Sequence, residues 1–199
     1  MTRQPPSIRL ATSADCDAVS AMLARAFAND PAISYIFPDP YVRAARLPGL
    51  FRLLFDSDSV DGMCLMVEGA QAATLWRSPN SIVASRMEMA GILWPMLRTF
   101  GSGLGRGLRV ANAIEAHYPD RQFWYLHIAG VEPVRQGLGL GSALIREGLA
   151  RRASEGLPAY LETATESNVV LYQSLGFQVT SEWHVPKGGP KFWSMLRPA

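Results

Sequence analysis

Residues 131–144 read VEPVRQGLGLGSAL, and the fold that the sequence predicts depends on this stretch more than on any other. It follows a mostly apolar and aromatic run, residues 123–131, which predicts a strand. It leads into residues 139–154, which predict a helix. Glycines in such a turn let the backbone approach a ligand closely, and free N–H groups at a helix start favour an anion. The stretch therefore predicts an anion-binding loop between a strand and a helix.

Three kinds of nucleotide-binding loop were weighed against this stretch. A P-loop requires Gly-Lys-Ser/Thr, and the stretch contains no lysine. A dinucleotide fingerprint requires G-x-G-x-x-G after an early strand, whereas the glycines here follow G-x-G-x-G late in the chain. The run Gln136-Gly137-Leu138-Gly139-Leu140-Gly141 fits a third pattern, Q/R-x-x-G-x-G/A. A glycine-rich loop that serves only tight packing stays as the alternative.

The rest of the chain predicts a mixed α/β sheet in a single domain, residues 1–199, because no repeat or linker divides it. Residues 78–120 are less regular, and we expect two helices there that cover one side of the sheet. Strands are predicted at 8–10, 63–68, 72–76, 123–131, 159–163, 177–185 and 191–196. Helices are predicted after the capping pair Thr12 and Asp15, at 47–55, around the apolar stripe 89–97, at 139–154 and at 168–175.

Composition excludes several classes of protein. The 199 residues are 48% hydrophobic and 18% charged, with a net charge of +2 and no basic run, which argues against a disordered chain or a nucleic-acid partner. No apolar run approaches the about 18 residues of a membrane span, and the start lacks a signal-peptide pattern. Cys16 and Cys64 form no CxxC motif, and His117 and His184 have no metal-ligand spacing. We expect a soluble, cytoplasmic protein without a metal.

Residues beyond the loop point to one family. Together with the loop, residues 160–163 (YLET) and 168–177 (NVVLYQSLGF) resemble the cofactor site of the GNAT superfamily of N-acetyltransferases. The similarity is strong from Phe123 onward, recognisable in the first forty residues and weak over 78–120, and within the superfamily it is greatest to the puromycin N-acetyltransferase group. This resemblance implies the GNAT fold, an α/β (α+β) fold with a mixed, mostly antiparallel sheet of about seven strands flanked by helices.

The resemblance also implies acetyl-CoA (coenzyme A) as the cofactor, held mainly by the half of the chain from about 122 to 199. The backbone of 126–131 would pair with the pantetheine arm, and the N–H groups of 136–142 would hold the pyrophosphate. The other half, about 1–121, would shape the acceptor site. The expected cofactor-binding residues are Ile128, Ala129, Gly130, Val131, Gln136, Gly137, Leu138, Gly139, Leu140, Gly141, Ser142 and Asn168.

The implied reaction is direct transfer of an acetyl group to an amine. Asn168 and Tyr172 lie one helical turn apart, and the resemblance makes Tyr172 the general acid for the departing thiolate. A backbone N–H of residues 128–130 would stabilise the oxyanion. Glu162 interrupts an apolar strand and is the first candidate base, with a solvated edge position or a salt bridge as alternatives. His127 is the second candidate, although a purely structural role is common for such a histidine, and deprotonation through water would need neither residue.

The sequence therefore predicts an N-acetyltransferase acting on a small-molecule amine, with a puromycin-like amine as one acceptor. A protein or peptide N-acetyltransferase and a catalytically silent acyl-CoA-binding module stay as alternatives. Candidate residues of the acceptor site, each equally able to be simple core, are Phe27, Tyr35, Phe37 and Trp94.

Overall fold

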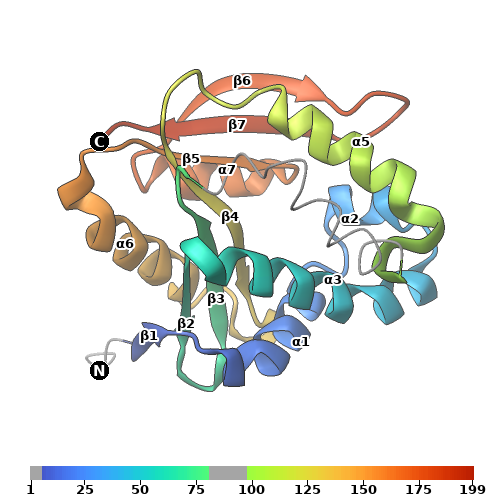
Figure 1. Ribbon diagram of the computed structural model, residues 1–199, viewed down its shortest axis with the longest axis horizontal. Coiled ribbons are helices and arrows are strands. Elements are labelled where there is room, and N and C mark those ends of the chain that lie inside the picture. Colours follow the sequence, from blue (N-terminus) through green and yellow to red (C-terminus); the bar gives the residue numbers. More distant parts are fainter. Residues whose placement is uncertain (1–5, 81–97) are drawn as a thin grey trace.

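The computed structural model describes residues 6–80 and 98–199 and contains a seven-stranded sheet in the order β1-β2-β3-β4-β5-β7-β6 (Figure 1). β4 and β5 are parallel, and every other pair of neighbours in the sheet is antiparallel. The mixed, mostly antiparallel sheet that the sequence predicts is confirmed. The strands are β1 Ile8–Leu10, β2 Met63–Val67, β3 Ala72–Arg77, β4 Trp124–Val131, β5 Ala159–Thr163, β6 Gln178–His184 and β7 Lys191–Arg197.

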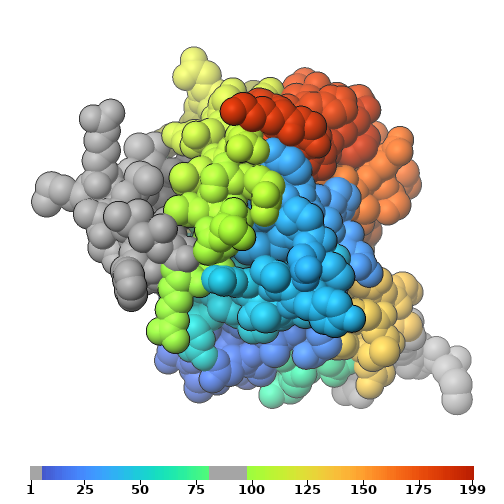
Figure 2. All heavy atoms as spheres, turned by 90° about the vertical axis from the view of Figure 1, so that its right-hand side faces the viewer, coloured from blue at the N-terminus to red at the C-terminus, as the bar shows by residue number. Residues whose placement is uncertain are grey.

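Helices cover both faces of this sheet. One hydrophobic core lies under α1, α2, α3 and α5, and a second lies between the sheet and α6 and α7. Figure 2 shows the first group from outside, with α5 in yellow-green beside the blue segment that holds α2 and α3. No helix among the described residues is long and apolar enough to cross a membrane. The helices are α1 Cys16–Ala26, α2 Pro31–Ile36, α3 Pro40–Asp61, α5 Leu104–Glu115, α6 Leu140–Arg152 and α7 Glu166–Gln173.

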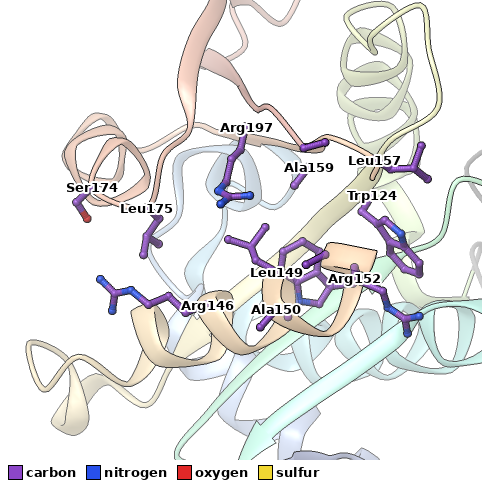
Figure 3. Close-up of a pocket in the computed structure, with 14 residues that line it drawn as sticks. Trp124, Arg146, Leu149, Ala150, Arg152, Leu157, Ala159, Ser174, Leu175 and Arg197 are labelled. Carbon is purple, nitrogen blue, oxygen red and sulfur yellow. The ribbon is translucent and has the colours of Figure 1, made fainter. Parts of the chain in front are cut away.

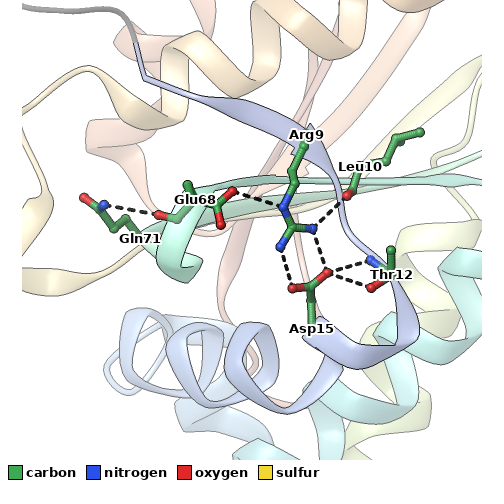
Figure 4. A network of polar contacts seen from close by, with 6 residues as sticks. All are labelled: Arg9, Leu10, Thr12, Asp15, Glu68 and Gln71. Carbon is green, nitrogen blue, oxygen red and sulfur yellow. Dashed lines mark hydrogen bonds and ion pairs between the residues drawn. The ribbon is translucent and has the colours of Figure 1, made fainter.

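A network around Arg9 fixes the start of the chain (Figure 4). The Arg9 guanidinium contacts both oxygens of Asp15 at 2.7 and 2.8 Å and also reaches Glu68 at 3.1 Å. Asp15 in turn accepts bonds from the N–H and hydroxyl of Thr12, as the predicted capping pair requires. Arg9 holds the pKa of Asp15 below its usual range. The network therefore ties β1 to the start of α1 and to the β2–β3 turn.

The N-terminal helices extend further than the sequence pattern predicts. Asp30 and Asp39 each accept two backbone N–H bonds and cap α2 and α3, and a proline follows each of them at the first helical position. The sequence pattern predicts no helix around Pro31. It predicts the next helix at 47–55, whereas α3 spans 22 residues and contains Pro48.

The segment before β4 is more regular than predicted in its second half. Gly103 caps α5, and Gly105 and Gly107 lie inside that helix. A Cβ on Gly107 would lie 2.6 Å from Cε1 of Phe100, so glycine allows this ring to pack against the helix. The predicted helical stripe 89–97 lies outside the described residues.

The sheet opens between its two parallel strands. β4 and β5 pair only at Trp124–Ala159 and at Tyr125–Tyr160, where both strands begin. Beyond these positions the described pairing of β4 is with β3 alone, so one edge of residues 126–131 is free to bind an extended ligand. β4 also bulges, because Leu75 pairs with Ile128 and Trp76 with Leu126, which leaves His127 as an extra residue.

Candidate active site

A cavity of about 700 Å³ lies where β4 ends and α6 begins. We call it the donor cavity. Its walls come from the end of β4, the glycine-rich loop, the first turn of α6, α7 and the segment after α1. The lining residues are Ala26, Phe27, Asn29, Asp30, Ala129, Gly130, Val131, Arg135, Gln136, Gly137, Gly139, Leu140, Gly141, Ser142, Ile145, Thr165, Ser167, Asn168, Leu171 and Tyr172.

The loop of the donor cavity has the conformation that an anion site needs. Gly137 and Gly139 have φ of 72° and 80°, which side chains other than glycine's rarely adopt. An added Cβ at either position would meet nothing within 4 Å, so the requirement for glycine is conformational rather than steric. The first helical bond of α6 runs from the Ala143 N–H to the Gly139 carbonyl at 3.0 Å. The N–H groups of residues 140–142 are therefore left for a ligand, at the positive end of the helix dipole.

The structure brings ten of the twelve expected cofactor residues to the donor cavity. Ile128 lines the neighbouring cavity instead, and Leu138 lines neither of the two. The side chain of Gln136 donates to the Val131 carbonyl at 3.3 Å, which braces the loop against the end of β4. Sequence reasoning missed Arg135, a cation in the cavity wall beside the loop. An anionic group such as a pyrophosphate fits this combination of free N–H groups and a guanidinium.

A second cavity, of about 230 Å³, lies on the side of the sheet covered by α1, α2, α3 and α5. We call it the acceptor cavity. Its wall is mostly apolar and contains the charged or titratable side chains of Asp30, His127 and Glu162. The apolar lining residues with large side chains are Phe27, Ile33, Ile36, Leu50, Phe51, Leu54, Phe100, Val110, Ile114, Leu126, Ile128 and Phe192.

Of the aromatic residues that the sequence suggests for the acceptor site, the described part of the chain places only Phe27 in a cavity wall. Phe27 lines both cavities. Tyr35 lines neither, because its hydroxyl accepts from Arg109 at 2.6 Å and donates to the Pro186 carbonyl at 3.3 Å. Phe37 is 2% exposed and stacks on Phe100, so it belongs to the core. Trp94 lies outside the described residues.

The two cavities meet at Tyr172. Both are lined by this residue, and the others that they share are Phe27, Asp30, Ala129 and Asn168. The Tyr172 hydroxyl has no hydrogen-bond partner among the described residues, so it can bond to a ligand in the shared space. Burial, and then the nearby carboxylates Glu162 and Asp30, raise the pKa of Tyr172, which keeps its proton in place at neutral pH. Its position suits a proton donor that acts between two bound molecules.

Glu162 lines the acceptor cavity from β5. The Tyr125 hydroxyl donates to its Oε1, while its Oε2 is buried without a hydrogen-bond partner among the described residues. Burial raises the pKa of Glu162 to about 8, although the bond from Tyr125 and the charge of Arg77 oppose the shift. Within the described part of the chain Glu162 forms no salt bridge, and its environment is not that of a solvated edge position. A carboxyl group with this pKa and a free oxygen can accept a proton from an amine.

His127 occupies the bulge of β4, and its side chain is oriented by Asp58. Its Nδ1 lies 2.6 Å from Oδ2 of Asp58, and Asp58 also accepts from Nε of Arg77 at 2.6 Å. Burial lowers the pKa of His127 and Arg77 lowers it further, against the opposing effect of Asp58. Burial alone would raise the pKa of Asp58, but its two partners hold it below the usual range. A neutral His127 that donates its Nδ1 proton to Asp58 has a basic Nε2.

Sequence reasoning missed both Tyr125 and Asp58. The signal for Asp58 was present, because it lies three residues after Phe55 and seven after Phe51 and so continues the apolar stripe of α3. An acid at such a position is buried only with partners, and its side chain is here fully buried between Arg77 and His127. No three His, Cys, Asp or Glu side chains in the described part of the chain are placed to hold a metal ion.

Sequence comparisons find partial relatives. No family model matches the chain. A mycothiol acetyltransferase from Nocardiopsis dassonvillei is 31% identical over 108 residues, and one from Acidothermus cellulolyticus is 32% identical over the same length. Each match covers about half of this chain, 51% and 52%, but only 29% and 31% of the relative. The chain therefore spans less than a third of the length of these relatives.

Solved structures match over nearly the whole chain. A histone acetyltransferase-related protein from Corynebacterium glutamicum superposes with a TM-score of 0.71 at 24% identity, covering 98% of both chains. The chain has the GNAT fold. A polyamine N-acetyltransferase from Drosophila melanogaster, with a TM-score of 0.64 and 15% identity, covers 98% of this chain and 100% of its own. None of these relatives is a puromycin acetyltransferase, so that part of the resemblance stays a prediction.

Within this GNAT fold the predicted catalytic residues share one wall. Tyr172, Glu162 and His127 come from α7, β5 and β4, and all three line the acceptor cavity. Tyr172 alone of the three also lines the donor cavity. Their roles stay predictions, and the geometry gives each of them access to one enclosed space.

Proposed function

We propose that the chain is an acetyl-CoA-dependent N-acetyltransferase that transfers the acetyl group directly to the primary amine of a small molecule. The observation that carries the proposal is the meeting of a donor cavity and an acceptor cavity at the hydroxyl of Tyr172, which has no hydrogen-bond partner in the described part of the chain. Transfer between two bound molecules requires such a junction, because the attacking and leaving atoms must lie together.

Acetyl-CoA fits the donor cavity by its chemistry. The N–H groups of residues 140–142 and the guanidinium of Arg135 would hold the pyrophosphate, and the free edge of 126–131 would pair with the pantetheine amides. Bound acetyl-CoA supplies an acetyl group activated as a thioester. A backbone N–H of residues 128–130 would stabilise the negative charge on the carbonyl oxygen. Tyr172 gives its proton to the departing sulfur and regains one from the new amide nitrogen.

Glu162 is the base that we propose for the acceptor. An amine enters as an ammonium ion and must lose a proton before its lone pair is available. The Oε2 of Glu162 would accept this proton, because it has no hydrogen-bond partner among the described residues. The raised pKa of Glu162 is also closer to the pKa of an amine. His127, oriented by Asp58, offers a second basic atom on the neighbouring strand. Asp30 adds negative charge near the junction and favours a cationic acceptor.

The wall of the acceptor cavity indicates the class of amine. Apolar side chains from five helical or strand segments enclose about 230 Å³, and carboxyl groups lie toward the junction. Such a cavity favours one amine on a compact apolar or aromatic body over a chain with three or more charges, because Asp30 and Glu162 can pair with two ammonium groups and any further one would be buried unpaired. An aliphatic primary amine attached to an aromatic body, like that of puromycin, is consistent with this wall. Both halves of the chain contribute to each cavity, so we propose one catalytic domain over residues 1–199.

The test is release of free thiol from acetyl-CoA with a panel of amines. The panel holds phenethylamine, puromycin, spermidine, an aminoglycoside and a short peptide. We expect turnover with phenethylamine or puromycin at a kcat/KM at least about tenfold above that with spermidine, the range that one unpaired buried charge produces. Preference for spermidine would contradict the apolar acceptor, and preference for the peptide would favour a peptide acetyltransferase. No turnover despite acetyl-CoA binding would favour a silent acyl-CoA-binding module.

A further inference from the structure

A third cavity, of about 430 Å³, lies at the C-terminal end of α6, where β4 and β5 begin and β7 ends (Figure 3). We call it the α6 cavity. It shares no lining residue with the donor cavity or the acceptor cavity. Its volume lies within the range of small-molecule sites in proteins. The proposed transfer reaction makes no use of it.

Among the described residues, the α6 cavity is lined by three arginines, Arg146, Arg152 and Arg197, and by no aspartate or glutamate side chain, and the last residue, Ala199, also lines it. Arg146 and Arg197 form no ion pair within the described part of the chain. Arg197 reaches from the end of β7 toward α6 (Figure 3), and its Nε lies over Gly176, where a Cβ would be 3.2 Å away. The cavity therefore has a positive wall, and packing against Gly176 fixes the direction of one of its guanidinium groups.

Arg152 adds an unsatisfied donor to this wall. Its guanidinium stacks on the Trp124 ring at 4.4 Å, and Glu155 accepts from both Arg152 and Trp124, at 3.2 and 2.6 Å. The Nε of Arg152 is nevertheless buried and has no hydrogen-bond partner among the described residues. A buried donor of this kind is unfavourable unless an acceptor reaches it. The negative end of the α6 dipole explains an arginine at position 152, but it does not explain Arg146 or Arg197.

Apart from Ser174, the side chains in the remainder of the described wall are apolar. Trp76 and Trp124 are only 1% and 5% exposed, and Leu149 and Leu175 face the same space. Gly148 lets α6 lie directly on Trp76, since a Cβ there would come within 2.7 Å of the indole. A ligand that fills the cavity must combine an acidic group with a hydrocarbon or aromatic body.

We propose that the α6 cavity binds a small organic anion, with a carboxylate or phosphate at Arg197 and an apolar body against Trp124 and Leu149. Guanidinium groups bind both kinds of oxyanion through paired N–H bonds, so the two head groups share one chemistry. The site borders the two paired positions that join β4 to β5, and Trp124 precedes Tyr125, the hydrogen-bond partner of Glu162.

The test is a titration of the ¹⁵N-labelled full-length chain, with coenzyme A present, followed by NMR. The signal is the indole N–H of Trp124, assigned with Trp124→Phe. The probes are octanoate, octyl phosphate and the neutral octanol. We expect a saturable shift with at least one anion and not with octanol, and the tighter anion identifies the head group.

Paired variants decide whether the arginines hold the anion. Arg146→Ala combined with Arg197→Ala should weaken binding at least tenfold. The control combines Arg121→Ala with Arg151→Ala, which removes the same charge from residues outside the cavity wall and should leave the affinity within about twofold. No saturable shift with either anion, an equal shift with octanol, or equal affinity in the two double variants would overturn the proposal.

Discussion

The donor cavity and the acceptor cavity are built in different ways. The donor cavity uses mainly backbone, with two glycines of positive φ and the free N–H groups of one helix start, all within residues 137–142. The acceptor cavity uses side chains from α2, α3, α5, α7, β4, β5 and β7, which are distant in sequence. Recognition of the donor is therefore encoded in a short local motif, whereas recognition of the acceptor depends on tertiary packing. Substitutions in the donor cavity should accordingly weaken acetyl-CoA binding, whereas substitutions in the acceptor cavity should lower activity toward the amine.

The largest effect should come from the acceptor side. Glu162→Gln removes the base but keeps the size of the side chain and the acceptor for the Tyr125 hydroxyl. We expect kcat/KM for the amine to fall by about 100-fold or more, the range for lost base catalysis, while acetyl-CoA affinity stays unchanged. In the unaltered protein activity should rise with pH toward about 8, where Glu162 loses its proton. Steady-state kinetics across pH and calorimetric titration with acetyl-CoA measure both.

A matched variant separates the two candidate bases. His127→Gln should lower activity by about tenfold, because His127 is the second basic group and not the first. A larger loss in His127→Gln than in Glu162→Gln would assign the base to His127 and its partner Asp58.

Acetyl-CoA binding in the donor cavity should be lost when the backbone of the glycine-rich loop is strained. Gly139→Val forces a branched side chain into a φ of 80°, although no atom lies within 4 Å of the added Cβ. Strain of a few kcal/mol should distort the loop and weaken acetyl-CoA binding by roughly 10- to 100-fold in a calorimetric titration.

Gly156→Val is the control for this variant. Gly156 also has a positive φ, 64°, and open space around its Cβ, but it lies after α6 and outside the donor cavity. Acetyl-CoA affinity should be unchanged there. Equal loss in both variants would mean that general destabilisation, and not the loop, explains the result.

A substitution of Tyr172, where the two cavities meet, should change kcat and not the affinity for acetyl-CoA. Tyr172→Phe removes the proton donor and should lower kcat by about tenfold or more, with acetyl-CoA affinity nearly intact. Tyr160→Phe is the control, because its buried hydroxyl bonds Ser194 outside both cavities. Unchanged turnover in Tyr172→Phe, measured by thiol release, would remove this residue from the mechanism.

The last prediction concerns stability and not activity. The folded-state pKa of Glu162, about 8, is above that of an unfolded glutamate, so the folded protein binds more protons between the two values. Glu162 therefore makes stability fall as pH rises through this window, by up to about 1.4 kcal/mol per pH unit. Glu162→Gln lacks this loss and should gain in relative stability from about pH 5 to about pH 8.5 in urea denaturation. The same pH dependence in both proteins would contradict the raised pKa.

These two cavities also explain how far the sequence could predict the structure. The glycine loop, the flanking strand and the helix are local patterns, and each lies close to its predicted place. Glu162 could be singled out because a charge in an apolar strand is unusual. The wall of the acceptor cavity could not be predicted. The directions of the Tyr35 and Phe37 side chains depend on where α2 and α3 begin and end, and the sequence did not predict those ends. Asp58 was missed because the predicted helix ended at residue 55, whereas α3 continues to Asp61.

The most direct test of the junction is a crystal structure of the protein with coenzyme A. The account predicts the pyrophosphate at the N–H groups of 140–142, the pantetheine arm along 126–131, and the sulfur within hydrogen-bond reach of the Tyr172 hydroxyl, facing the acceptor cavity. Coenzyme A bound elsewhere, or bound with its sulfur turned away from Tyr172, would contradict the claim that the two cavities form one active site.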